Sequence, residues 1–173
     1  MTARSLLRQI DRNGERWLLL GFYVMIVATI FLEVLRRFVL EYSSIWGEEI
    51  ARYSFIYLAW IGASAAVRER AHIRIDVLMQ FLPNRGKALL YLFGDLLTLA
   101  LALIAVYWSM HPLLTSWQFG SVTDGLRISR VWFLAAVPFG FALMSFRLLQ
   151  SIVRDWRDLR ADRPVYEGQK LFD

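Results

Sequence analysis

Four long apolar stretches dominate this sequence and decide its fold class. They cover residues 17–32, 53–67, 88–108 and 131–146, and Asp95 is the only charged residue within them. About 20 predominantly apolar residues in a helix cross the ~30 Å hydrocarbon core of a bilayer, so each stretch with its flanking residues is a candidate membrane span. The pattern predicts an all-α integral membrane protein with four transmembrane helices.

The composition agrees with long helices in a lipid environment. Hydrophobic residues make up 57% of the 173 residues, and there are only 10 glycines and 4 prolines. Such a chain is more apolar than a typical soluble domain, and it has too few of the glycine and proline residues that form the turns of a many-stranded fold. The absence of cysteine excludes disulfides, thiolate metal sites and a cysteine nucleophile.

The chain divides into three expected segments. A membrane domain over residues 17–149 follows an N-terminal segment of residues 1–16 and precedes a charged tail of residues 150–173. The four helices of the membrane domain are expected at about residues 17–39, 46–76, 86–110 and 128–149.

The N-terminal segment carries arginine at every fourth position, at residues 4, 8, 12 and 16. This spacing places the arginines on one side of a helix, which favours an amphipathic helix lying in the plane of the membrane surface. A positively charged flank that only sets the topology explains the same residues, and both interpretations stay open.

The positive charge of the chain is distributed asymmetrically between the two sides of the predicted membrane domain. The net charge is +5, and most of the 20 lysines and arginines fall before the first span, between the second and third, or after the fourth. The arginines on the opposite side are Arg36, Arg37, Arg52, Arg127 and Arg130. By the positive-inside rule we expect both termini to be cytoplasmic. Topology therefore explains the basic charge, and we expect no nucleic-acid partner.

Residues that carry common enzyme chemistry are missing from the sequence. The only histidines, His72 and His111, lie at helix margins, too few to hold a haem at membrane depth. No zinc-protease, nucleophile-elbow or P-loop motif occurs. We therefore expect no catalytic, cofactor-binding or metal-binding residue and no enzyme activity.

Two polar clusters border the first two apolar stretches. Glu33 lies three and four residues before Arg36 and Arg37, a spacing that favours an internal ion pair over an ion-binding site. Glu48 and Glu49 follow Ser44 and Trp46 at the expected start of the second helix, where Ser44 is a candidate cap and Glu48 is four residues before Arg52. Capping explains these carboxylates, and contact with a basic partner or a cation is the alternative.

Three further residues, at successive i, i+4 positions, form a possible polar ridge after the second apolar stretch. They are Arg68, His72 and Asp76, and we expect them to lock the corner between two helices. Asp95 lies inside the third apolar stretch, so its side chain should face protein or be protonated, with a hydrogen bond to a neighbouring helix as the simplest role.

Small residues predict a surface for close helix packing. Gly62, Ala63 and Ala66 make one flank of the second helix smooth, and Pro138 with Gly140 should bend the fourth helix. We expect these five residues to form an interface with a partner protein in the membrane.

The order of these elements resembles the small membrane subunit, the DctQ-like or Q component, of tripartite ATP-independent periplasmic (TRAP) transporters. The resemblance covers roughly residues 17–149. The residues that carry it are Trp46, Glu48, Glu49, Arg52, Gly62, Ala63, Arg68, His72, Asp76, Leu82, Pro83, Pro138 and Gly140.

The resemblance implies a part in an importer of organic acids that is driven by an ion gradient, usually of sodium. A periplasmic binding protein would deliver the substrate, the large M subunit would hold the substrate and ion sites, and the small subunit would scaffold M without a substrate site. We expect the periplasmic residues Arg36, Arg37, Glu41, Asp124 and Arg127 to help dock the binding protein. Membrane lipids are the other expected partners.

Two alternatives remain from the residues alone. One is a stand-alone, proton-coupled transporter that uses Asp95 as its membrane carboxylate. The other is a membrane anchor for a redox enzyme, which a haem absorption spectrum would reveal.

Overall fold

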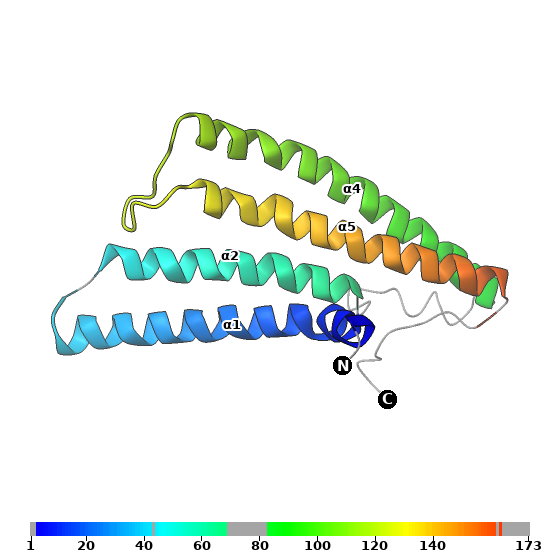
Figure 1. Cartoon of the computed structure of the whole chain (residues 1–173), viewed down its shortest axis with the longest axis horizontal. Helices are drawn as coiled ribbons and strands as arrows, with labels where there is room; N and C mark the ends of the chain where they lie inside the picture. The colour runs from blue at the N-terminus through cyan, green and yellow to red at the C-terminus, as the bar shows by residue number, and fades with distance from the viewer. Residues whose placement is uncertain (1–2, 43, 69–82, 162, 164–173) are drawn as a thin grey trace.

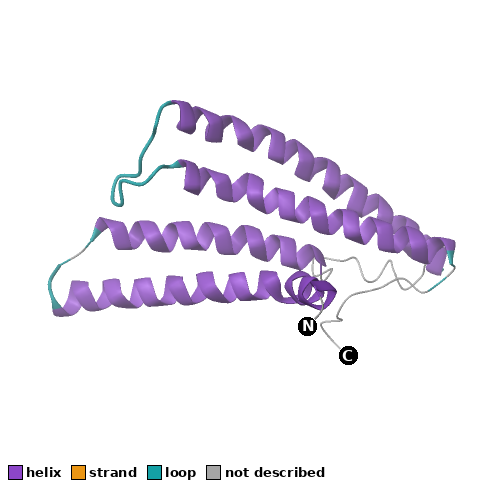
Figure 2. Cartoon of the chain, in the orientation of Figure 1, coloured by secondary structure: helices purple, strands orange, loops and turns teal. Residues whose placement is uncertain are grey.

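The computed structural model describes residues 3–42, 44–68, 83–161 and 163. These residues form four long helices: α1 (Ala3–Val39), α2 (Ile45–Arg68), α4 (Asn84–Gln118) and α5 (Val131–Arg160). Each helix contains a segment that is long and apolar enough to cross a membrane. Figure 2 shows helices joined by loops and turns, which confirms the predicted all-helical fold with four potential membrane spans.

The four helices lie side by side in one layer, in the order α1, α2, α5, α4 (Figure 1). The extensive contacts are those of α1 with α2, of α2 with α5 and of α5 with α4. The α1–α2 and α4–α5 connections lie together at one end of the row, and the start of α1 and the end of α5 lie toward the other (Figure 1). The helices α1 and α4 are therefore the two edges of the row, and α2 and α5 form its centre.

The interior of this row is small. Its core cluster consists of Val67, Ala102, Met144 and Leu148, with Ala63, Leu99 and Phe141 packed against it. Many large apolar side chains remain exposed, for example Phe31 at 61%, Leu101 at 61% and Tyr107 at 76%. A water-soluble protein rarely leaves so large an apolar surface uncovered, whereas lipid tails or a membrane partner can cover it.

The helix boundaries differ from the sequence-based expectations at several ends. The first helix already begins at Ala3 and includes the N-terminal segment, α4 continues to Gln118, and α5 continues to Arg160 inside the expected tail. The last eight residues of the expected helix 46–76, beyond Arg68, lie outside the described residues.

Pro112 lies inside α4 rather than after it. Proline removes one helical hydrogen bond, but helices in membranes tolerate this where hydroxyl groups can bond to the backbone nearby. Ser109 Oγ donates to Val106 O at 2.9 Å, and Thr115 Oγ1 donates to His111 O at 2.9 Å. These hydroxyls flank the proline, and the helix runs past it to Gln118.

Candidate functional site

Glu49, near the start of α2, holds the loop between α4 and α5. The residue is 7% exposed. Its carboxylate accepts hydrogen bonds from three consecutive backbone N–H groups, of Asp124 at 3.1 Å, Gly125 at 3.1 Å and Leu126 at 2.7 Å. Successive N–H groups that converge on one point form an anion-binding nest. One buried carboxylate therefore attaches α2 to a loop about 75 residues further along the chain.

Gly125 lies where the loop that Glu49 holds comes close to α2. Thr123 N donates to Ile128 O at 2.9 Å, which closes the loop on itself. A Cβ atom at Gly125 would lie 3.0 Å from Glu49 Oε2 and 3.1 Å from the backbone C of Ile45. A larger residue at position 125 would therefore push the loop away from α2.

Glu33, near the end of α1, binds the residue that precedes α2. Its carboxylate accepts a hydrogen bond from Ser44 N at 2.9 Å and another from Ser44 Oγ at 2.7 Å. Gly47 makes room for this contact, because a Cβ atom there would lie 2.7 Å from Glu33 Oε2. The hydrogen-bonding partner of Glu33 is thus Ser44 rather than Arg36 or Arg37. The turn after α1 brings this carboxylate to the start of α2, where free N–H groups favour an anion.

Two other polar contacts at the start of α2 are exposed. The expected i, i+4 ion pair between Glu48 and Arg52 is confirmed, with side chains 73% and 58% exposed. The guanidinium of Arg36 lies 4.5 Å from the ring centroid of Trp46, which is a cation–π contact between α1 and α2. Exposed ion pairs contribute little stability, so we regard Glu49 and Glu33 as the main polar links at this end.

A buried ion pair joins three helices near the opposite end of the row. Arg147 Nε of α5 donates to Glu15 Oε1 of α1 at 2.7 Å, with side chains only 8% and 7% exposed. Ser64 Oγ of α2 donates to the same oxygen at 3.4 Å, and Arg147 also donates to Gln150 Oε1 at 2.8 Å. Loss of either partner should be destabilising, because the other buried charge would lose this ion pair.

Asp95 lies on the side of α4 that faces α5. It shares helical spacing with Leu92, Leu99 and Ala102, and the last two contact the core cluster that includes residues of α5. Its Oδ2 atom is buried and has no hydrogen-bond partner among the described residues. Across that same part of the chain, no three His, Asp or Glu side chains come together as a metal site.

Comparison with protein families decides what kind of chain this is. The family model described as "Tripartite ATP-independent periplasmic transporters, DctQ component" matches residues 26–158, which is more than half of the chain. The chain belongs to the DctQ family. The matched region includes the Glu33 and Glu49 contacts and Arg147, whereas Glu15 precedes it.

Relatives of this DctQ-family chain include one small permease protein and two longer permease proteins. SiaQ, a sialic acid TRAP transporter small permease protein of Vibrio cholerae, is 28% identical over 149 residues, which cover 86% of this chain and 84% of SiaQ. DctMQ, an isethionate TRAP transporter permease protein of Oleidesulfovibrio alaskensis, is 26% identical over 154 residues, 86% of this chain and 24% of DctMQ. SiaT, a sialic acid TRAP transporter permease protein of Haemophilus influenzae, is 30% identical over 138 residues, 79% of this chain and 22% of SiaT. The chain spans less than a quarter of the length of the two longer relatives.

The DctQ-family protein is therefore a multi-pass membrane protein and a small permease subunit of a TRAP transporter, not an enzyme. This assignment takes the place of the two alternatives that the residues alone left open, the stand-alone transporter and the redox anchor.

Six of the residues that carried the family resemblance lie at helix ends in this DctQ subunit, while Gly62, Ala63, Pro138 and Gly140 lie inside α2 and α5. Trp46, Glu48, Glu49 and Arg52 belong to the first two turns of α2. Arg68 is the last residue of α2, and Pro83 precedes α4 in an extended backbone conformation. His72 and Asp76 lie outside the described residues, and so does the corner that they were expected to lock.

The small residues of the expected partner interface lie in two environments in the DctQ subunit. Pro138 and Gly140 are buried, and a Cβ atom at Gly140 would lie 2.4 Å from a side-chain atom of α2. They pack α5 against α2 within the chain. Gly62, Ala63 and Ala66 are half-buried and keep part of their surface open.

The expected docking residues belong to the end of the row at which both connections lie (Figure 1). Arg36 is half-buried beside Trp46, while Arg37, Glu41, Asp124 and Arg127 are exposed. Sequence reasoning found these charges but missed the buried groups Glu15 and Gly125, which carry no local motif.

Proposed function

We propose that this DctQ-family protein is the small permease subunit of an importer of organic acids in a bacterial inner membrane, driven by an ion gradient, usually of sodium. In this proposal both termini are cytoplasmic. The subunit scaffolds a large M subunit, contributes to the docking face for a periplasmic binding protein, and holds no substrate itself.

The exposed apolar surface of the helix row is the observation that carries the scaffold role. The most apolar window of α1 has none of its residues buried within the chain, and that of α4 has 11% buried. The permease relatives DctMQ and SiaT are more than four times as long as the region they share with this chain. Lipid tails can cover part of this surface, and a large companion in the same membrane would cover the rest and account for the length of those relatives.

We propose no substrate site in this chain because its buried charged side chains named above already form contacts within the chain. Glu33 and Glu49 bind backbone or hydroxyl groups of neighbouring loops, and Glu15 with Arg147 form an ion pair. Each of these groups already serves a contact between helices of this chain. Binding an organic acid would require breaking one of those contacts.

A stripe of residues on α2 is the surface that we assign to the M subunit. Gly62 and Ala66 share a helix face with Phe55 and Ala59, because these positions follow one another at intervals of four, three and four residues. Phe55 is 59% exposed and Ala59 is exposed. Small residues at such a position let a second helix approach closely.

Co-purification of the M subunit tests this assignment. Ala59→Trp adds bulk to the stripe where the side chain already faces outward, so the fold of this chain should persist and tagged protein should recover much less M. Ala100→Trp is the matched control, because Ala100 is an exposed alanine on the edge helix α4. Full recovery of M with Ala59→Trp, or loss with Ala100→Trp alone, would contradict the assignment.

Charge reversal tests the docking face. Arg37→Glu and Arg127→Glu should each weaken binding of the periplasmic binding protein to the assembled membrane complex, and the difference should shrink at high salt. Arg160→Glu, an exposed substitution at the other end of the row, is the control. Equal affinity of all variants at low salt would remove the docking role.

A further inference from the structure

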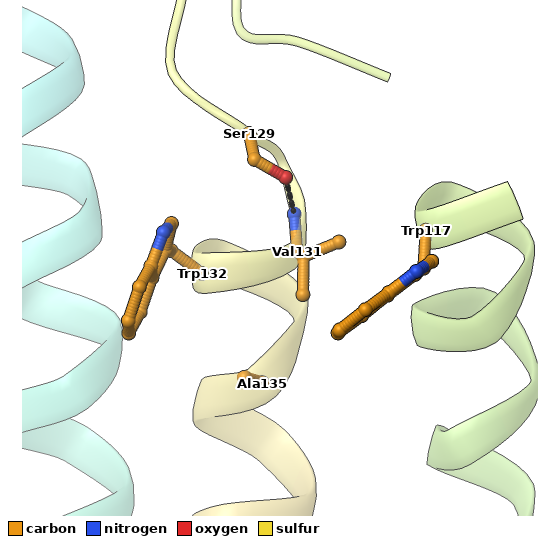
Figure 3. A pocket seen from close by; sticks show the side chains of 5 residues that line it. All are labelled: Trp117, Ser129, Val131, Trp132 and Ala135. Carbon is orange, nitrogen blue, oxygen red and sulfur yellow. Dashed lines mark hydrogen bonds between the residues drawn. The ribbon is translucent and has the colours of Figure 1, made fainter. Parts of the chain in front are cut away.

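A cleft of about 480 Å³ opens between α4 and α5 at the end of the row that carries the connections. It is lined by Trp117 of α4, by Ser129 of the preceding loop, and by Val131, Trp132 and Ala135 of α5. Figure 3 shows the indole rings of Trp117 and Trp132 on either side of Val131, with Ala135 one turn further along α5. The lining is almost entirely apolar, and the cleft is open on the side that faces away from the chain.

The two tryptophans have the properties of residues at a membrane–water boundary. Trp117 is 71% exposed and Trp132 is 70% exposed. They lie at the last turn of the α4 span and the first turn of the α5 span. Neither indole N–H donates a hydrogen bond to a described residue, although a tryptophan at this depth normally finds a polar partner for that group. Two donors are thus available at the edge of an apolar cleft.

The loop beside the cleft carries positive charge. Arg127 and Arg130 are exposed and lie within two residues of Ser129, which lines the cleft. Arg130 is 4.0 Å from Asp124, the limit of an ion pair, and Arg127 makes no ion pair with a described residue. Guanidinium groups bind phosphate oxygens in a two-pronged geometry. The apolar cleft therefore ends beside two indole donors and beside a loop that carries two exposed arginines.

We propose that this cleft binds one phospholipid molecule. An acyl chain occupies the space between Trp117, Val131 and Ala135, and the phosphate is bound by Arg127 and Arg130. The indole N–H groups donate to the ester or phosphate oxygens between them. A phospholipid fits better than a partner helix, because a helix would not supply an anion at the level of the two arginines together with a chain narrow enough for the cleft. The proposal is independent of the role assigned to the stripe on α2, but it shares Arg127 with the proposed docking face, so Arg37→Glu is the variant that tests docking without altering the cleft.

Native mass spectrometry of the full-length protein in detergent, titrated with palmitoyl-oleoyl-phosphatidylglycerol, tests the proposal. Wild type should retain one phospholipid at collision energies that remove all other lipid. Ala135→Phe fills the cleft and should abolish this retained adduct. Ala28→Phe, at an exposed alanine on the far edge helix α1, should keep it. The variant Arg127→Gln/Arg130→Gln should weaken retention by about tenfold or more, because hydrogen bonds to charged groups contribute that much to binding.

Further measurements distinguish the phosphate from the acyl chain and keep the test valid if Ala135→Phe folds poorly. Palmitoyl-oleoyl-glycerol has the same chains without phosphate and should not be retained. Brominated phosphatidylglycerol should quench tryptophan fluorescence at low lipid content, and replacing both Trp117 and Trp132 by Phe should remove that component. Equal retention by wild type, the cleft variant and the arginine variant would overturn the proposal. Unchanged lipid retention by Ala135→Phe with loss of the co-purified M subunit would overturn it too and assign the cleft to a protein.

Discussion

The substitution Glu49→Gln isolates the contact between α2 and the α4–α5 loop. Oε1 of Glu49 accepts from Asp124 and Gly125, while Oε2 accepts from Leu126. An amide has one oxygen and one NH₂ group, so at least one of these N–H donors would face another donor. A hydrogen bond to a charged group is worth roughly 1.5–3 kcal/mol. The loop should therefore detach from α2 more easily by about that amount.

Hydrogen exchange of the full-length protein, followed by mass spectrometry, measures how often the α4–α5 loop detaches from α2. Exchange of the loop peptide spanning residues 119–130 should become roughly 10- to 100-fold faster in Glu49→Gln, since each 1.4 kcal/mol changes an opening equilibrium about tenfold. Glu48→Gln is the neighbouring control, because Glu48 forms only an exposed pair with Arg52. Its loop should exchange at the wild-type rate. Wild-type exchange in Glu49→Gln would refute the assignment of the loop's position to this carboxylate.

Two further substitutions test the packing of the row. Gly140→Ala would place a Cβ atom 2.4 Å from Trp60 Cβ and should destabilise the protein by about 1–3 kcal/mol in thermal unfolding, whereas Gly94→Ala meets open space and should be neutral or stabilising. Glu15→Gln should destabilise by roughly 3–5 kcal/mol, because it removes the negative charge from the buried ion pair with Arg147. The double variant Glu15→Gln/Arg147→Met should recover part of that loss.

The outcomes that would contradict these predictions are specific to each contact. Equal melting temperatures for Gly140→Ala and Gly94→Ala would mean that α2 and α5 are not as close as the Gly140–Trp60 contact requires. Additive effects of the two substitutions in the Glu15–Arg147 cycle would mean that the pair carries no coupling energy.

The four helices were predictable from the sequence because the signal for each one lies within a single continuous stretch of residues. A bilayer demands about 20 apolar residues in a row, and this requirement is visible in any window of the chain. The Glu48–Arg52 pair was predictable for the same reason, since its partners are one helical turn apart.

The contacts that shape the site could not be predicted because their partners are distant or have no side-chain signature. Arg147 pairs with Glu15, which lies 132 positions away in the sequence. Glu49 binds backbone N–H groups, which every residue except proline possesses, so only the fold reveals which loop it holds. The order of the helices in the row also depends on such contacts. The connections place α1 beside α2 and α4 beside α5, but they do not determine that α2 lies next to α5.

Reconstitution into proteoliposomes tests the central claim, that this subunit works only as part of a larger permease. The purified protein alone should take up no organic acid under a sodium or proton gradient, and uptake should appear only when the large M subunit and the binding protein are added. Gradient-driven uptake by this chain alone would contradict the claim.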